Sequence, residues 1–174
     1  MHGASYNKII KDCGISKTSA YLYFDGKDDL IAEVARDSLR RVLEALGPWR
    51  QAKTAATFWK RLREAADHLL AFVAASPNDL AVLQAAYSSR VLPLTTDDEA
   101  HALAWFDDLL DNGAKLGVVR KDVERALLRR ATISVFRAID AWALEAMADT
   151  DAPDLEPGFR LLASLWTPRK GGRK

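Results

Sequence analysis

The stretch Gly14-Ile15-Ser16-Lys17-Thr18-Ser19-Ala20-Tyr21-Leu22-Tyr23-Phe24 decides the fold of the N-terminal part of the chain. A glycine here allows the left-handed backbone that ends one short helix, and Ser16 can cap the free amides of the next. Two short helices joined by such a turn are typical of a helix-turn-helix. In this motif Ile10 and Ala20 face each other, and we expect this large and small pair to fill the helix contact.

The rest of the chain is also helical in pattern. Strand signals are nearly absent, while Ala, Leu, Arg, Glu, Asp and Lys recur at helical spacing. Breakers such as Gly47-Pro48 and Pro93 separate these patterns. We therefore predict an all-α protein with helices at about 5–12, 16–24, 27–46, 54–75, 77–90, 97–116, 122–148 and 157–166.

Helix length divides the chain into units. The first two predicted helices are shorter than the roughly 12 to 15 residues that an isolated helix needs in water, so they must pack on the third. This gives an N-terminal helix-turn-helix unit at residues 1–47. The longer, more apolar helices of residues 48–168 form a C-terminal helical bundle, and the basic residues 169–174 are expected to be a disordered tail.

Composition bounds the class of protein. The 174 residues are 49% hydrophobic and 28% charged, which excludes dominant disorder. Only Cys13 carries a thiol, so no internal disulfide is possible and we expect a cytoplasmic location. No stretch approaches the roughly 18 apolar residues of a membrane helix, and the polar start does not resemble a signal peptide. The net charge of +1 requires any nucleic-acid contact to come from a local patch.

Together with Gly26-Lys27-Asp28-Asp29-Leu30, the opening stretch resembles the DNA-binding signature of the TetR family of transcriptional regulators. Residues 116–122 and 139–142 are similar, more weakly, to a turn and a long helix of that family's C-terminal domain. The family has a further helix ahead of the one expected at Ser5, and the sequence given starts after it. The resemblance implies a DNA-binding domain followed by a ligand-binding and dimerisation domain.

The resemblance also assigns roles to residues of the motif. The helix after Ser16 would enter the major groove, where lysine can donate to guanine, and threonine or tyrosine can touch a thymine methyl. Backbone phosphates would be contacted by Ser5, Tyr23 and Lys27, and base edges or the adjacent backbone by Lys17, Thr18, Ser19 and Tyr21. Because residues 1–27 carry a net charge of only +2, binding should need a dimer.

Large aromatic and small side chains share the apolar stripes of the C-terminal helices. These side chains are explained equally well by packing in the core and by a pocket for an apolar or planar compound. Arg137 and Asp140 are costly to bury unpaired, so they would pair with each other, with a ligand or across a dimer. The candidate ligand-binding residues are Trp59, Leu62, Tyr87, Trp105, Leu109 and Arg137.

The predicted helix at 122–148 is apolar on more than one side. Between Ala131 and Met147 only Arg137, Asp140 and Glu145 are charged, so one face can cover its own bundle while another covers a second subunit. The candidate homodimer interface consists of Trp142, Leu144, Phe159, Leu162 and Trp166.

The sequence thus predicts a ligand-responsive repressor that binds a palindromic operator as a homodimer, without cofactor or metal. The alternative is an α-helical dimeric module that binds a small molecule or a protein and has lost DNA binding. An enzyme is not expected, since no nucleophile with a base and no phosphate-binding glycine loop is present. Cys13 fits a small apolar role, and Asp97 and Asp98 beside His101 fit a helix start better than a metal site.

Overall fold

The computed structural model describes residues 6–12, 14–88, 96–147 and 153–167, and this part of the chain consists of helices and turns without strands. The predicted all-α class is confirmed, and each predicted helix end that falls within the described ranges lies within three residues of the observed one. The helices are α1 (Tyr6–Asp12), α2 (Lys17–Tyr23), α3 (Lys27–Leu46), α4 (Ala55–Ala74), α5 (Pro77–Ser88), α6 (Thr96–Lys115), α7 (Arg125–Ala146) and α8 (Glu156–Trp166).

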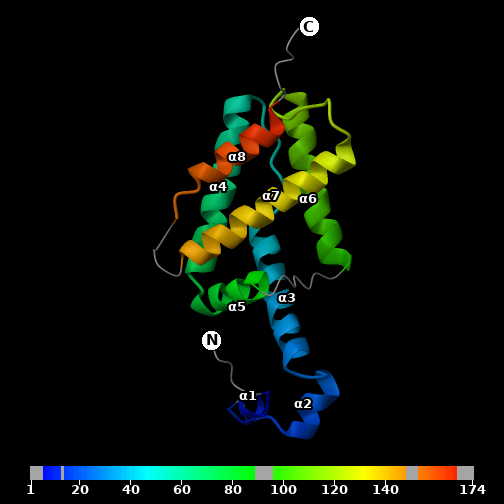
Figure 1. Ribbon diagram of the computed structural model, residues 1–174, viewed down its shortest axis with the longest axis vertical. Helices are drawn as coiled ribbons and strands as arrows, with labels where there is room; N and C mark the ends of the chain where they lie inside the picture. Colours follow the sequence, from blue (N-terminus) through cyan, green and yellow to red (C-terminus); the bar gives the residue numbers. More distant parts are fainter. Residues whose placement is uncertain (1–5, 13, 89–95, 148–152, 168–174) are drawn as a thin grey trace.

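The helices form a small head and a larger bundle (Figure 1). Helices α1 and α2 lie at one end of the molecule, and α3 leads from them into the bundle of α4 to α8. Helix α7 runs diagonally across this bundle. None of the described helices combines the length and the apolar character that crossing a membrane requires.

Helix α3 takes part in both regions. Near its start, Leu30 packs on the small cluster of Tyr6, Ile10 and Ala20 that joins α1 to α2. Further along, Leu39 is buried in a second cluster with residues of α4, α5 and α7. The boundary predicted at residue 47 would assign all of α3 to the head. The second half of α3 packs in the bundle, so the head and the bundle share this one helix.

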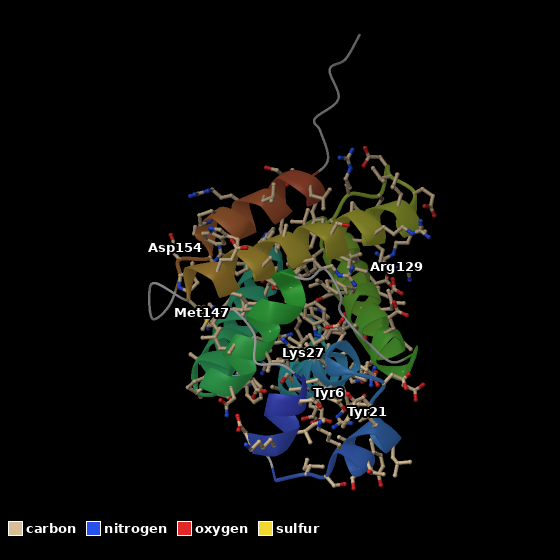
Figure 2. All side chains as sticks on the ribbon, turned by 60° about the horizontal axis from the view of Figure 1, so that its bottom comes forward. Tyr6, Tyr21, Lys27, Arg129, Met147 and Asp154 are labelled. Atoms are coloured by element: carbon tan, nitrogen blue, oxygen red, sulfur yellow. The ribbon has the colours of Figure 1, made fainter. Side chains whose placement is uncertain are left out.

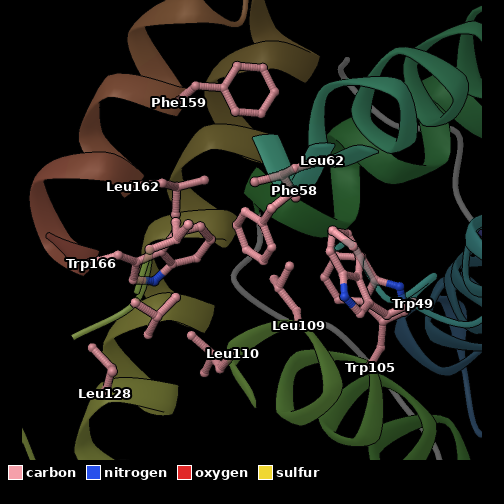
Figure 3. Close-up of a cluster of buried hydrophobic side chains, with 13 residues drawn as sticks. Trp49, Phe58, Leu62, Trp105, Leu109, Leu110, Leu128, Phe159, Leu162 and Trp166 are labelled. Atoms are coloured by element: carbon pink, nitrogen blue, oxygen red, sulfur yellow. The ribbon is translucent and has the colours of Figure 1, made fainter. Parts of the chain in front are cut away.

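The main core lies between α4, α6, α7 and α8 (Figure 3). Phe58 and Trp166 are fully buried there, and their rings meet edge to face with centroids 6.0 Å apart. The Trp166 indole N–H donates to the Thr132 hydroxyl at 2.9 Å, which satisfies a polar atom that the core would otherwise leave unpaired. This core fixes the positions of α6 and α7, two long helices that form part of the wall of the cavity described below.

Helix α7 begins at Arg125, three residues later than the sequence predicts. The Glu124 carboxylate caps it by accepting from the backbone N–H groups of Ala126 and Leu127 at 3.0 and 2.8 Å. Just before this cap, Arg120 and Asp122 pair with each other in the connecting turn. A side-chain cap at Glu124 therefore fixes the start of the helix.

Candidate nucleic-acid interface and ligand cavity

Gly14 shapes the turn between α1 and α2. Its φ of +68° lies in the left-handed region, and the Ile15 N–H donates to the Ile10 carbonyl at 3.1 Å. This six-to-one hydrogen bond is the usual way for a helix to end on a left-handed glycine. The Ser16 hydroxyl then accepts from the Ser19 N–H at 3.0 Å and caps α2. The turn and the cap predicted from the sequence are both confirmed.

Tyr6 holds the two short helices together, and sequence reasoning missed it. Its hydroxyl lies 3.3 Å from the Ala20 carbonyl oxygen and 3.4 Å from that of Phe24, so it donates to the end of α2. Figure 2 shows Tyr6 close to Tyr21, whose ring meets it edge to face at 5.1 Å. Burial, followed by the nearby Tyr21 and Asp29, raises the pKa of the Tyr6 hydroxyl, which remains a donor at neutral pH.

Ile10 and Ala20 fill the crossing of α1 and α2 as predicted. They retain only 4% and 5% of their surface and share one buried cluster with Tyr6. A larger side chain at either position would push the helices apart, since closely packed contacts tolerate little added volume.

The only signal for Tyr6 in the sequence was its position one helical turn before Ile10, which does not identify its partners on α2.

Most of α2 is open to solvent, since Ala20 is the one buried residue of this helix. Tyr21, Leu22 and Tyr23 are 53%, 77% and 79% exposed, which is high for large apolar side chains. The predicted DNA-contact residues Lys17, Thr18 and Ser19 are exposed as well, although the Ser19 hydroxyl lies 2.8 Å from that of Ser16. Ser5 lies outside the described residues.

Two lysines begin the helices of this region. Lys17 begins α2 and is exposed, and Lys27 begins α3 and is half-buried. Within the described part of the chain, neither ammonium group lies in an ion pair. Both charges are therefore available to an anionic partner such as a phosphate backbone.

A short exposed helix that follows a tight turn, with lysines at the starts of this helix and the next, is typical of helix-turn-helix DNA-binding proteins. Residues 1–34 match the family model described as bacterial regulatory proteins, tetR family. This match confirms the TetR resemblance for the N-terminal part, and with it a DNA-binding transcriptional regulator. Neither the curated proteins nor the solved structures gave a significant match to the chain.

A cavity of about 530 Å³ lies inside the bundle, within the range usual for small-molecule sites. All six helices from α3 to α8 contribute to its wall. Of the residues proposed for ligand binding, the wall includes Leu62, Tyr87, Trp105 and Arg137. Leu109 and Trp59 are not in the wall: Leu109 is fully buried in the core, and the Trp59 ring packs against Trp166.

The cavity has polar groups on α5 and α7. The Tyr87 hydroxyl donates to Asp140 Oδ2 at 3.1 Å, a partner that the sequence did not suggest. Asp140 keeps accessible surface because it faces the cavity, yet surrounding protein removes most of its bulk water. This burial raises the pKa of Asp140 to about 6, against the opposing effects of the Tyr87 hydrogen bond and Arg137.

Arg137 and Asp140 do not form an ion pair with each other. Arg137 is exposed, lines the same cavity, and lowers the pKa of Asp140 only from a distance. Burial raises the pKa of Tyr87 too, with Asp140 adding to the effect. Within the described ranges, no three acidic, histidine or cysteine side chains come together in a way that could hold a metal ion.

The residues proposed for the dimer interface fall into two groups. Trp142 is 41% exposed, whereas Leu144, Phe159, Leu162 and Trp166 are buried within the protomer. The exposed large apolar side chains of α7 and α8 also include Leu127 and Leu161, at 60% and 50%. Neither leucine was predicted, because Leu127 precedes the apolar stretch between Ala131 and Met147, and Leu161 is adjacent to the buried Leu162 in an apolar run of α8.

A polar cluster of Ser38, Arg41 and Asp79 joins α3 to α5, and no pattern in the sequence indicates it. Ser38 donates to Asp79 Oδ1 at 2.7 Å, and Arg41 binds the same oxygen. The Asp79 side chain is only 10% exposed. Burial works to raise the pKa of Asp79, but hydrogen bonds from Ser38, Arg41 and Ser76 outweigh it, and the pKa is lowered. The helix that carries the head is thereby tied to a helix of the cavity wall.

Proposed function

We propose that the protein is a ligand-responsive transcriptional repressor that binds a palindromic operator as a homodimer. The observation that carries the proposal is the exposed face of α2 within the region that matches the tetR family model. Tyr21, Leu22 and Tyr23 leave large side chains exposed on this short helix, and a concentration of exposed hydrophobic side chains is a feature of interaction sites. Double-stranded DNA fits, because Lys17 and Lys27, which begin α2 and α3, are available to a phosphate backbone.

In this proposal α2 lies in the major groove. Lys17, Thr18, Ser19 and Tyr21 read base edges, while Ser5, Tyr23 and Lys27 contact phosphates. The Ser16–Ser19 hydrogen bond fixes the Ser19 hydroxyl, so Ser19 contributes less to readout than its neighbours. The weak positive charge of one head makes a second head necessary for useful affinity.

Dimerisation is proposed to use the outer faces of α7 and α8. Trp142 and Leu161 supply exposed apolar surface there, and aromatic anchors dominate the energetics of many interfaces. Two heads held by a twofold axis would reach successive major grooves about one helical turn apart. The predicted interface residues Leu144, Phe159, Leu162 and Trp166 would then support the exposed residues from within rather than touch the partner.

Ligand control is proposed to act through α3. Leu39, Val42 and Leu46 of this helix line the cavity, while Leu30 of the same helix packs on the head. A ligand that binds more tightly to one orientation of α3 shifts the population toward it. Release of DNA follows if that orientation moves the two heads off the spacing of the operator.

Selection from a pool of random duplexes tests the proposal, because the pool contains every short operator sequence. The purified chain is expected to enrich a motif with twofold symmetry. Lys17→Ala should lose or alter the motif. Lys121 is an exposed residue of the turn between α6 and α7, which lies at the end of the bundle away from the head (Figure 1), and Lys121→Ala should enrich the same motif as the wild type. Failure of the wild-type chain to enrich any sequence would contradict the proposal.

A further inference from the structure

The polar end of the cavity has hydrogen-bonding capacity that the described protein does not use. Tyr87 bonds only Oδ2 of Asp140, and no hydrogen bond to Oδ1 is formed by a described residue. The Arg137 guanidinium, three residues earlier on the same helix, makes no ion pair or hydrogen bond within the described ranges. One free acceptor and one free set of donors therefore lie near each other on α7.

The rest of the wall is apolar. Among the lining residues, the polar or charged ones are Tyr87, Glu99, Arg130, Ser134, Arg137 and Asp140. All others carry aliphatic or aromatic side chains or are glycine. A molecule that fills the cavity therefore needs a mostly apolar body, because a polar group placed against this wall would lose its hydrogen bonds to water.

The charges of the described lining residues are balanced. Glu99 and Asp140 oppose Arg130 and Arg137, so these four side chains carry no net charge when all are ionised. An anionic ligand at the polar end would be attracted by Arg137 but repelled by Asp140, and a cationic ligand would be attracted by Asp140 but repelled by Arg137. A neutral group avoids both repulsions and the desolvation of an ion.

We propose that the cavity selects a neutral, largely apolar molecule with one hydroxyl or amide group, held between Asp140 and Arg137. A hydroxyl or amide both donates and accepts, so it can donate to Asp140 Oδ1 while it accepts from Arg137. Tyr87 orients the carboxylate by binding its other oxygen. The assignment rests on the proposed function only in taking this cavity as the effector site.

Three probes of equal chain length separate the charge classes: 1-decanol below its solubility limit, and decanoate and decylammonium below their micellar concentrations. Their binding is measured at pH 7.5 by displacement of the neutral dye Nile red from the full chain. Decanol is expected to displace the dye at about tenfold lower concentration than either ion, the size of effect expected for one hydrogen bond to a charged group.

Two variants make the test independent of overall stability, because they move the preference in opposite directions. Asp140→Asn leaves a net positive wall and should shift the preference toward decanoate. Arg137→Gln leaves a net negative wall and should shift it toward decylammonium. Glu145→Gln changes an exposed charge of α7 outside the cavity and should keep the wild-type order.

An ion that outcompetes decanol in the wild type, or the same order in all variants, would overturn the inference. Absence of displacement by all three probes would overturn it too. Neither result would touch the DNA-binding proposal, which the duplex selection tests separately. A reversal of preference between Asp140→Asn and Arg137→Gln is the result that the inference requires.

Discussion

Gly14 is the residue on which the position of α2 depends most. A Cβ added there would meet no atom within 4 Å, so the cost of a substitution lies in the φ of +68° alone. Gly14→Ala is expected to lower the free energy of unfolding by about 1 kcal/mol, the usual penalty for the left-handed conformation. Chemical denaturation measures this change.

Gly26 provides the matched control. Its Cβ would also meet nothing within 4 Å, but its φ of 168° is extended backbone that any residue adopts. Gly26→Ala should therefore leave stability nearly unchanged. Equal effects of the two substitutions would contradict a special role for the Gly14 turn.

Asp140 is expected to make stability depend on pH. Because its pKa rises from 3.8 unfolded to about 6 folded, the folded state binds the proton more tightly. The contribution of the protonated Asp140 carboxyl to stability is therefore fully present below the unfolded pKa and is lost as pH rises through about 6. Tyr87 and Arg137 face the carboxylate, and Glu99 and Arg130 line the same cavity.

Asp140→Asn should thus raise the Tm at pH 8, where the wild type carries an unfavourable charge, and change it little at pH 4. Thermal unfolding of both proteins across this range measures the difference. A Tm gain that is the same at pH 4 and pH 8 would show that the carboxyl charge is not the cause.

Single residues were predictable from sequence where the information is local. The left-handed Gly14, the Ser16 cap and the Ile10–Ala20 contact all follow from spacing within one motif. Tyr87 and Asp140 are separated by 53 residues, so their hydrogen bond depends on how α5 packs on α7. The sequence pattern alone does not show that Tyr87 and Asp140 lie close together in space.

At the scale of elements, α3 connects the cavity to the head, and Asp79 fixes its place against α5. Removing the charge by Asp79→Asn weakens the hydrogen bonds from Ser38 and Arg41. Hydrogen bonds to a buried charge contribute about 2 kcal/mol, and we expect a loss of this size at pH 7. Because the folded pKa of Asp79 is lowered, its contribution is present above the unfolded pKa and disappears as pH falls through the folded value.

Denaturation at pH 7 and pH 3 measures this loss, which should shrink at the lower pH. Asp67→Asn, a change at an exposed carboxylate of α4, is the control and should have little effect at either pH. An Asp79→Asn protein as stable as the wild type at pH 7 would show that the cluster does not hold α3.

Helices were predictable because each carries its own breakers and caps. The sequence did not predict that α3 would serve both regions, since its apolar residues repeat evenly from Leu30 to Leu46. Nor could it separate Leu62, which lines the cavity, from Leu109, which is sealed in the core. Both leucines lie on apolar stripes, and only the packing of the whole bundle determines that Leu62 borders the cavity while Leu109 does not.

At the scale of the whole molecule, the proposed dimer determines whether two heads can act together. Trp142→Asp places a charge on the exposed apolar surface of α7 and is expected to convert a dimer into a monomer. Sedimentation velocity measures the mass. Leu22→Asp, a change at an exposed residue of the head, should leave the dimer intact. A wild-type chain that sediments as a monomer at micromolar concentration would contradict the proposed interface.

The most direct test of DNA binding by the head is the salt dependence of affinity for an enriched duplex, measured by fluorescence anisotropy. We predict affinity that falls steeply as salt rises, with Lys27→Ala reducing the slope by about one and Lys121→Ala leaving it unchanged. Binding that is insensitive to salt, or equal slopes for the Lys27→Ala and wild-type chains, would contradict the claim that the α1–α2 end of the molecule lies on DNA.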